Sequence, residues 1–128
     1  MKEASRKLLE KADRSLRVAT SLQASGEAEF SVSRTYYAMF YTAEALLNER
    51  GLHFRKHGGV HAAFGEQFSK TGVFDPKYHR WLLEAFNKRI TSDYEIESGI
   101  SLDEAATLIR QAREFLQQAQ GYLAKIPT

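Results

Sequence analysis

Two short stretches of this sequence carry residue types that could do chemistry. RKHGGVH, residues 55–61, holds an arginine, a lysine and two of the chain's four histidines. NKRITSDY, residues 87–94, holds a second arginine with an aspartate and a tyrosine. Cations of this kind bind anions. An imidazole that converges with an arginine can also cleave RNA without a metal, because cleavage needs a base for the 2′-hydroxyl and a cation for the phosphate.

The histidines of the first stretch raise the hypothesis of a metal site. His53, His57 and His61 are spaced four apart, so on one unbroken helix they would share a face and could bind zinc. The glycines around them indicate that the helix is broken here, and no carboxylate lies close by in sequence. We therefore interpret the stretch as a polar loop that leads into a helix, and we expect no metal and no cofactor.

The second stretch places a charge on an apolar face. Arg89 follows Phe86 by three residues, on the face that the fourth predicted helix turns to the core. A guanidinium there needs a partner, because an unpaired buried charge is costly, and Asp93 lies four residues on. Tyr94 adds a phenol. Two interpretations stay open: an ion pair that fixes the helix end, which is the commoner origin of such clusters, or an anion or nucleotide site.

An aromatic run lies in the second predicted helix. Tyr36, Tyr37, Phe40 and Tyr41 follow helical spacing, and the helix is apolar on more than one face. Such rings can stack on nucleic-acid bases. In a helix this apolar, packing in the core or in a dimer interface is the expected role.

Five helices are predicted to position these residues, since apolar side chains recur every three or four positions and no strand-like alternation occurs. They cover about residues 2–24, 27–50, 58–69 and 77–91, and a fifth begins after Ser101. Asp75 and Pro76 predict the start of the fourth, and Ser101 with Glu104 forms a capping box for the fifth. We predict an all-α, up-and-down bundle of about five helices, one domain spanning residues 1–128.

Composition limits the possible functions. The chain has 128 residues, no cysteine, and 18 basic against 16 acidic side chains, a formal net charge of +2. The lack of cysteine excludes disulfides and thiolate catalysis, and the net charge alone does not indicate nucleic-acid binding. No signal peptide or membrane-spanning run is recognisable, so we expect a cytoplasmic protein without membrane contact.

Three blocks in order resemble HEPN-domain proteins: SRTYYAMFYTAEALLNERGL, KHGGVHAAFGEQF and NKRITSDYE. The resemblance covers roughly residues 5–124 and is to small, stand-alone prokaryotic members. It implies a helical bundle that is often a homodimer and is frequently paired with a small nucleotidyltransferase. In several branches it also implies a metal-independent ribonuclease that acts as a toxin or defence effector.

The resemblance also bears on individual residues. The ribonuclease signature is an arginine followed, after four to six residues, by a histidine late in the fold. Arg89 matches the arginine, Asp93 stands near the histidine's place, and Tyr94 matches a tyrosine that the partner enzyme can nucleotidylate. This branch thus has Arg-x-x-x-Asp-Tyr. The interval from Arg55 to His61 fits the signature but falls too early in the fold, and we interpret it as coincidental.

We predict a protein that acts by binding, as the dimeric partner of a nucleotidyltransferase or as a module that contacts RNA or a nucleotide, within a toxin–antitoxin pair. Arg89, Asp93 and Tyr94 would line its groove. One alternative is a metal-independent ribonuclease in which Arg89 holds the phosphate and Asp93 or a histidine is the base. The other is a structural adaptor. The first stretch could also fold back, so that His57 supplies the imidazole that Arg89 lacks.

Overall fold

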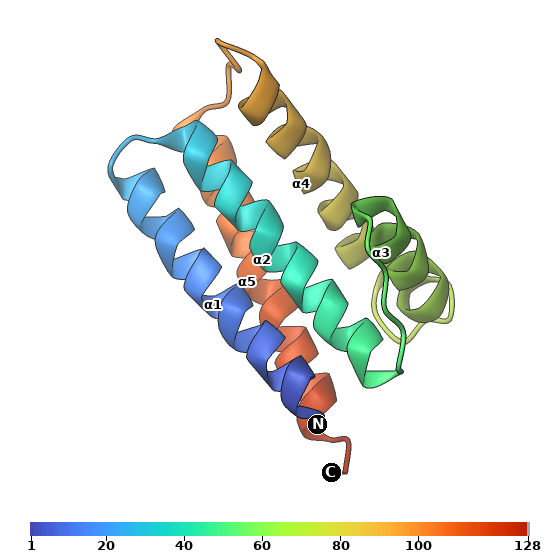
Figure 1. Cartoon of the computed structure of the whole chain (residues 1–128). Helices are drawn as coiled ribbons and strands as arrows, with labels where there is room; N and C mark the ends of the chain where they lie inside the picture. The colour runs from blue at the N-terminus through green and yellow to red at the C-terminus, as the bar shows by residue number, and fades with distance from the viewer. Residues whose placement is uncertain (128) are drawn as a thin grey trace.

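The computed structural model describes residues 1–127, which contain five α-helices and one π-helical segment joined by loops (Figure 1). They are α1 (Glu3–Ala24), α2 (Ala28–Glu49), α3 (His57–Phe64), η1 (Gly65–Ser69), α4 (Pro76–Tyr94) and α5 (Leu102–Ala124). The four long helices alternate in direction, and α3 with η1 lies between α2 and α4 along the chain (Figure 1). No strand occurs within these residues, so the predicted all-α bundle is confirmed. Residue 128, the last of the predicted domain, lies outside the described part.

The central element is α2, in agreement with its several apolar faces. It packs against α1, α3, α4 and α5, and thirteen of its 22 residues are buried. Small hydroxyl side chains let α1 approach it closely, because they bond to carbonyl groups of the facing helix. Ser31 Oγ donates to the carbonyl of Ala19 at 2.8 Å, and Ser15 Oγ donates to the carbonyl of Arg34 at 2.7 Å. The second bond ties α1 to the turn of α2 that carries Arg34.

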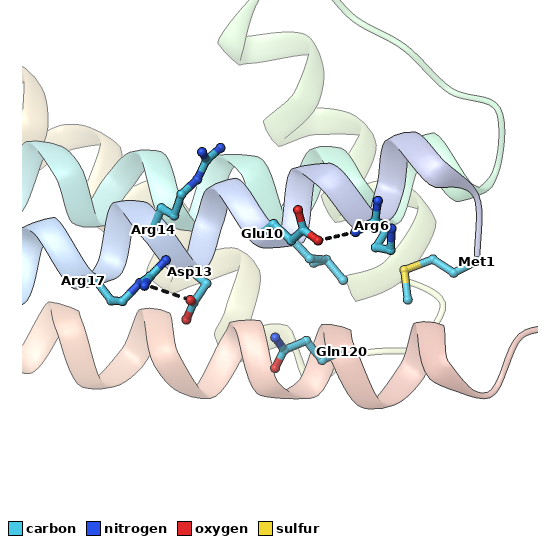
Figure 2. Close-up of a pocket in the computed structure, with 8 residues that line it drawn as sticks. Met1, Arg6, Glu10, Asp13, Arg14, Arg17 and Gln120 are labelled. Carbon is cyan, nitrogen blue, oxygen red and sulfur yellow. Dashed lines mark hydrogen bonds and ion pairs between the residues drawn. The ribbon is translucent and has the colours of Figure 1, made fainter.

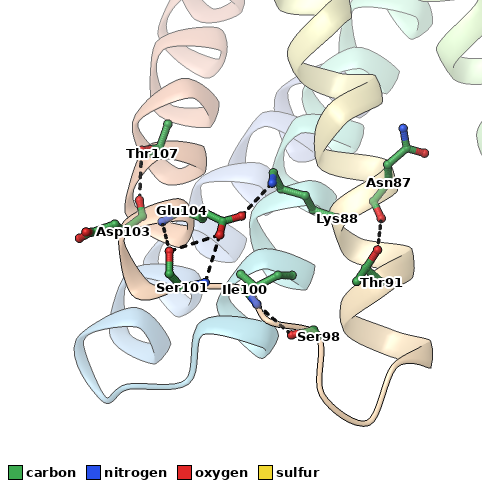
Figure 3. A network of polar contacts seen from close by, with 9 residues as sticks. All are labelled: Asn87, Lys88, Thr91, Ser98, Ile100, Ser101, Asp103, Glu104 and Thr107. Atoms are coloured by element: carbon green, nitrogen blue, oxygen red, sulfur yellow. Dashed lines mark hydrogen bonds and ion pairs between the residues drawn. The ribbon is translucent and has the colours of Figure 1, made fainter.

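The connection between α4 and α5 is held by polar contacts (Figure 3). The predicted capping box is present: Ser101 Oγ accepts from the amide of Glu104, and Glu104 Oε1 accepts from the amide of Ser101. The other oxygen of Glu104 accepts from Lys88 Nζ at 2.9 Å. This ion pair is partly exposed and adds little stability, but it joins the C-terminal half of α4 to the first turn of α5.

The polar stretch at residues 55–61 leads into a helix, as predicted. α3 begins at His57, one residue before the predicted start, and Gly58 and Gly59 lie in its first turn. His53 is not helical, so the three histidines do not share one unbroken helix. A Cβ at position 59 would lie 3.1 Å from Phe54, so glycine lets the preceding segment fold tightly over the start of α3. Gly59 therefore serves close packing here, and both His57 and His61 are helical.

After α3 the helix widens into η1, which the sequence pattern did not predict. Gly65 opens this segment, and a Cβ at this position would lie 2.7 Å from the ring of His79. The His79 ring fills that space and bonds through Nε2 to the carbonyl of His61 at 3.0 Å. Within residues 1–127, no helix is both long and apolar enough to cross a membrane.

Candidate functional site

The hydroxyl of Tyr36 joins two histidines. Tyr36 is fully buried in α2, and its Oη lies 2.6 Å from Nδ1 of His57 and 2.7 Å from Nε2 of His61. The two histidines are one turn apart on α3, so both rings face α2. A phenol carries one proton, so Tyr36 donates to one imidazole and accepts an N–H from the other. The three side chains form one hydrogen-bonded chain.

Burial keeps all three members of this chain neutral at pH 7. It lowers the pKa of His61 to about 4, with smaller contributions from the charges of His57 and His79. Burial also lowers the pKa of His57, and the nearby charge of Arg89 lowers it further. The pKa of the Tyr36 phenol is raised, chiefly by burial. Nε2 of the half-buried His57 makes no hydrogen bond within residues 1–127, so this nitrogen can exchange a proton with a ligand.

Two arginines meet at the neighbouring ring. The guanidinium carbon of Arg34 lies 4.7 Å from the ring centroid of Tyr37, and that of Arg89 lies 5.2 Å from the same centroid. Arg34 precedes Tyr37 by one turn of α2, whereas Arg89 arrives from α4. A guanidinium that stacks on a ring keeps its N–H groups free for a carboxylate or phosphate.

The charge at this ring is only partly balanced. Arg89 Nε lies 2.9 Å from Asp93 Oδ2, so the predicted ion pair between positions 89 and 93 is present. The Nε–H does not point at the carboxylate, however, and this buried atom makes no hydrogen bond within residues 1–127. Arg34 forms no ion pair within the same residues. The cluster of Arg34, Tyr37 and Arg89, which we call the arginine–tyrosine site, therefore carries excess positive charge.

The structure brings His57 beside the arginine–tyrosine site. The His57 ring centroid lies 5.8 Å from that of Tyr37, and the ring stacks on Phe40 at 4.4 Å. The His57 imidazole and the Arg89 guanidinium thus both lie near the Tyr37 ring, and the charge of Arg89 lowers the pKa of His57. Arg55, the other end of the early spacing match, is exposed and forms no ion pair or side-chain hydrogen bond within residues 1–127.

The other residues singled out in the sequence differ in how deeply they are buried. Tyr36 and Phe40 are core residues, whereas Tyr37 and Tyr41 are half-buried at the edge of the core. Tyr94, the last residue of α4, is 78% exposed. Across residues 1–127, no three His, Cys, Asp or Glu side chains are grouped so that they could hold a metal ion.

Two members of the site were missed by reading the sequence. Arg34 lies three residues before Tyr37, a helical spacing that brings the two side chains together, and this signal was available. His61 was predicted to lie one turn into the third helix, but its contact with Tyr36 was not predicted. Its contact with Tyr36 spans 25 positions in sequence, so local spacing gives no sign of it.

A second arginine-rich region lies between α1 and α5 (Figure 2). It is a groove of about 460 Å³ lined by Met1, Arg6, Leu9, Glu10, Asp13, Arg14, Arg17 and Gln120. Arg6 pairs with Glu10, and Arg17 Nε lies 3.3 Å from Asp13 Oδ2. These pairs lie within α1 and are solvent-exposed, so most of the positive charge in this groove is balanced locally.

The fold and the site together define a small helical protein with a basic, aromatic-lined site. The family model described as HEPN domain matches residues 5–122, and the chain belongs to this family. Its relatives include a protein of Methanocaldococcus jannaschii named "Putative toxin", 38% identical over 117 residues that cover 91% of this chain and 80% of that protein. A Gloeobacter violaceus protein named "UPF0332 protein" is 37% identical and is covered over 94% of its length, with 92% of this chain aligned. A second M. jannaschii "Putative toxin" is 31% identical over 98% of this chain and 93% of its own length.

Proposed function

We propose that this protein is a toxin-type HEPN protein that binds RNA through the arginine–tyrosine site. The observation that carries the proposal is the convergence of Arg34 and Arg89 on Tyr37. Within residues 1–127, Arg89 pairs with Asp93 and Arg34 forms no ion pair. Planar guanidinium groups match the geometry of phosphate oxygens, and neutralising phosphates supplies much of the affinity of RNA-binding proteins. The names of two relatives support the toxin role.

In this proposal the protein is a cytoplasmic homodimer and the partner of a small nucleotidyltransferase. Exposed apolar side chains near one end of the bundle support a partner surface there: Phe30 is 62% and Ile96 98% exposed. Their segments lie together, since Ser98 Oγ donates to Glu29 Oε1 at 2.8 Å. Tyr94 is accessible to a modifying enzyme, in keeping with its place in the Arg-x-x-x-Asp-Tyr pattern.

Binding of a labelled RNA, followed by fluorescence anisotropy, tests the proposal. Arg89→Gln is expected to weaken binding about 30-fold, by roughly 2 kcal/mol, because a charge-assisted contact to phosphate is lost. Arg17→Gln is the matched control, since Arg17 also pairs with an aspartate four residues away on its own helix. It should change the affinity less than twofold. Equal effects of the two substitutions would place RNA elsewhere on the molecule.

One observation favours a second function, metal-independent cleavage of RNA. His57 and Arg89 both lie near the Tyr37 ring, the pKa of His57 is lowered, and its Nε2 makes no hydrogen bond within residues 1–127. Nε2 would take the proton of a 2′-hydroxyl, whose oxygen attacks the adjacent phosphorus while Arg89 stabilises the added charge. The bond from phosphorus to the 5′-oxygen breaks, and this oxygen leaves with a proton from water.

An assay in excess chelator separates cleavage from binding. If His57 is the base, the wild type cuts RNA and His57→Asn loses at least 100-fold in rate while it still binds. His53→Asn changes an exposed histidine of the same segment and is the control. Binding without cleavage by the wild type would leave the first function alone.

A further inference from the structure

We propose that the arginine–tyrosine site continues across α2 onto α1 as a track for single-stranded RNA, with bases on Tyr37 and Tyr41 and phosphates on Lys11, Arg34 and Arg89. The proposal rests on the RNA binding proposed above and specifies which form of RNA is bound and where it runs. No similarity to a relative enters it, because it depends on contacts between three helices.

The track is a row in which rings and cations are neighbours. Tyr41 lies one turn after Tyr37 on α2, and the two ring centroids are 6.0 Å apart with planes inclined by 33°. At the α1 end, Lys11 Nζ lies 4.6 Å from the centroid of Tyr41. At the other end, Arg34 and Arg89 cover Tyr37 at 4.7 and 5.2 Å. Both tyrosines are half-buried, so each ring is braced by the core while part of it faces solvent.

The cations of the row have few counter-charges. Lys11 and Arg34 form no ion pair within residues 1–127, and Arg89 has Asp93 alone. Burial raises the pKa of the Glu44 carboxyl, and the charge of Lys11 opposes this rise. A cation on a ring without a carboxylate partner keeps its charge available for phosphate.

These contacts favour a single strand. Duplex RNA keeps its bases stacked on one another, whereas an unpaired strand exposes base faces to aromatic and guanidinium planes. The 6.0 Å between the rings exceeds the rise of ~3.4 Å per nucleotide along one strand of B-DNA, so the rings suit neighbouring bases of an extended strand. As phosphates draw the flexible Lys11 away from Tyr41 and Arg34 away from Tyr37, a face of each ring becomes free for a base.

The test measures anisotropy of a labelled oligouridine of about eight nucleotides. Tyr41→Leu keeps an apolar side chain and removes the ring, and it should weaken binding about tenfold, within the range for loss of one base stack. Lys11→Gln should weaken binding about fivefold and reduce the slope of log affinity against log salt by about one. Lys77→Gln is the matched control, because Lys77 also lies over aromatic rings, Tyr78 and Trp81, but pairs with Glu114 at 2.8 Å. Its affinity should stay within twofold of the wild type.

The outcomes distinguish the track from the proposed function. If Arg89→Gln loses binding while Lys11→Gln and Tyr41→Leu do not, the track is overturned and RNA binding at the arginine–tyrosine site stands. If the wild type binds no RNA, both proposals fall. Competition by duplex RNA equal to that of the single strand overturns the track, and equal affinity for DNA of the same sequence overturns its assignment to RNA. Thermal unfolding of each variant shows whether a loss reflects misfolding, and Lys11→Gln, which removes an exposed charge, provides a test that does not depend on the core.

Discussion

Two regions of this protein gather arginines, and they do so in opposite ways. In the groove between α1 and α5, Arg6 and Arg17 pair with acids of their own helix and lie largely in solvent (Figure 2). In the arginine–tyrosine site, Arg34 and Arg89 come from different helices and share the ring of Tyr37. In the groove, acidic side chains of the same helix neutralise the arginines. In the arginine–tyrosine site, the positive charge of two arginines lies against aromatic rings at the edge of the core.

This difference is the reason why we propose the arginine–tyrosine site, and not the groove between α1 and α5, as the place where RNA binds. Exposed ion pairs one helical turn apart contribute little energy and are common on helical surfaces. A guanidinium that is 21% exposed and lacks a hydrogen bond at Nε is uncommon, because an unsatisfied buried donor is costly. An unsatisfied buried donor requires an explanation, and a bound ligand is the one that we propose.

The largest expected effect concerns the buried histidine next to the arginine–tyrosine site. The pKa of His61 is about 4 in the folded protein, whereas a histidine in the unfolded chain has a pKa of about 6.5. The folded state therefore binds fewer protons than the unfolded chain between these values, and stability present above pH 6.5 is lost as the pH falls toward 4. Chemical denaturation should show the free energy of unfolding falling by about 3 kcal/mol more in the wild type than in His61→Gln between pH 7 and pH 4.

His53→Gln is the control for this measurement, since His53 is exposed and precedes α3. Its profile should follow the wild type over the whole pH range. A His61→Gln profile parallel to the wild type would show that the region is as solvent-like as the α1–α5 groove, and the contrast between the two regions would disappear.

The next effect tests whether the hydroxyl of Tyr36 holds the site together. Tyr36→Phe leaves one nitrogen of His57 and one of His61 without their shared partner, so it should cost about 2 kcal/mol of stability. Arg17→Gln, which breaks an exposed pair in the groove, should cost less than about 0.5 kcal/mol. Guanidinium chloride unfolding at pH 7.5 measures both. Losses of similar size would mean that cross-helix and within-helix polar contacts are equivalent here.

The smallest effect compares two aspartates. Asp93→Asn removes the counter-charge of Arg89 and should raise RNA affinity about threefold at low salt, with the gain shrinking as salt screens the charges. Asp13→Asn removes the counter-charge of Arg17 and should leave affinity unchanged within error. Anisotropy titrations at two salt concentrations provide the comparison. A gain for Asp13→Asn instead would assign RNA to the α1–α5 groove.

Much of the fold could be predicted because its determinants are local. Apolar spacing of three and four located the long helices to within a few residues, and Asp75 with Pro76 and the Ser101–Glu104 capping box marked two of their starts. Helix ends were less accurate: α4 runs to Tyr94, three residues beyond its predicted end. The residues that extend it include Asp93, whose ion pair with Arg89 favours continued helix.

The site was predictable only where its contacts are local. Arg89 and Asp93 are neighbours by helical geometry, and their pairing followed from the spacing alone. The helical state of His57 did not, because the two glycines that follow it placed the predicted start one residue later. The packing of Phe54 against the second of them, Gly59, is not visible in local sequence. Contacts between α2 and α3 decide which histidine nitrogens face Tyr36, and no local rule specifies them.

The single proton on the Tyr36 hydroxyl has a consequence for the tautomers of both histidines. Nε2 of His57 is unprotonated only when Nδ1 of that ring donates to Tyr36, which then donates to Nε2 of His61. The opposite polarity turns His57 Nε2 into a donor and reverses every bond in the chain. The direction of the hydrogen bonds between Tyr36 and His61 therefore decides whether Nε2 of His57 accepts or donates a proton. Conversely, a ligand that accepts a hydrogen bond from His57 Nε2 changes the tautomer of His61, which the ligand does not contact.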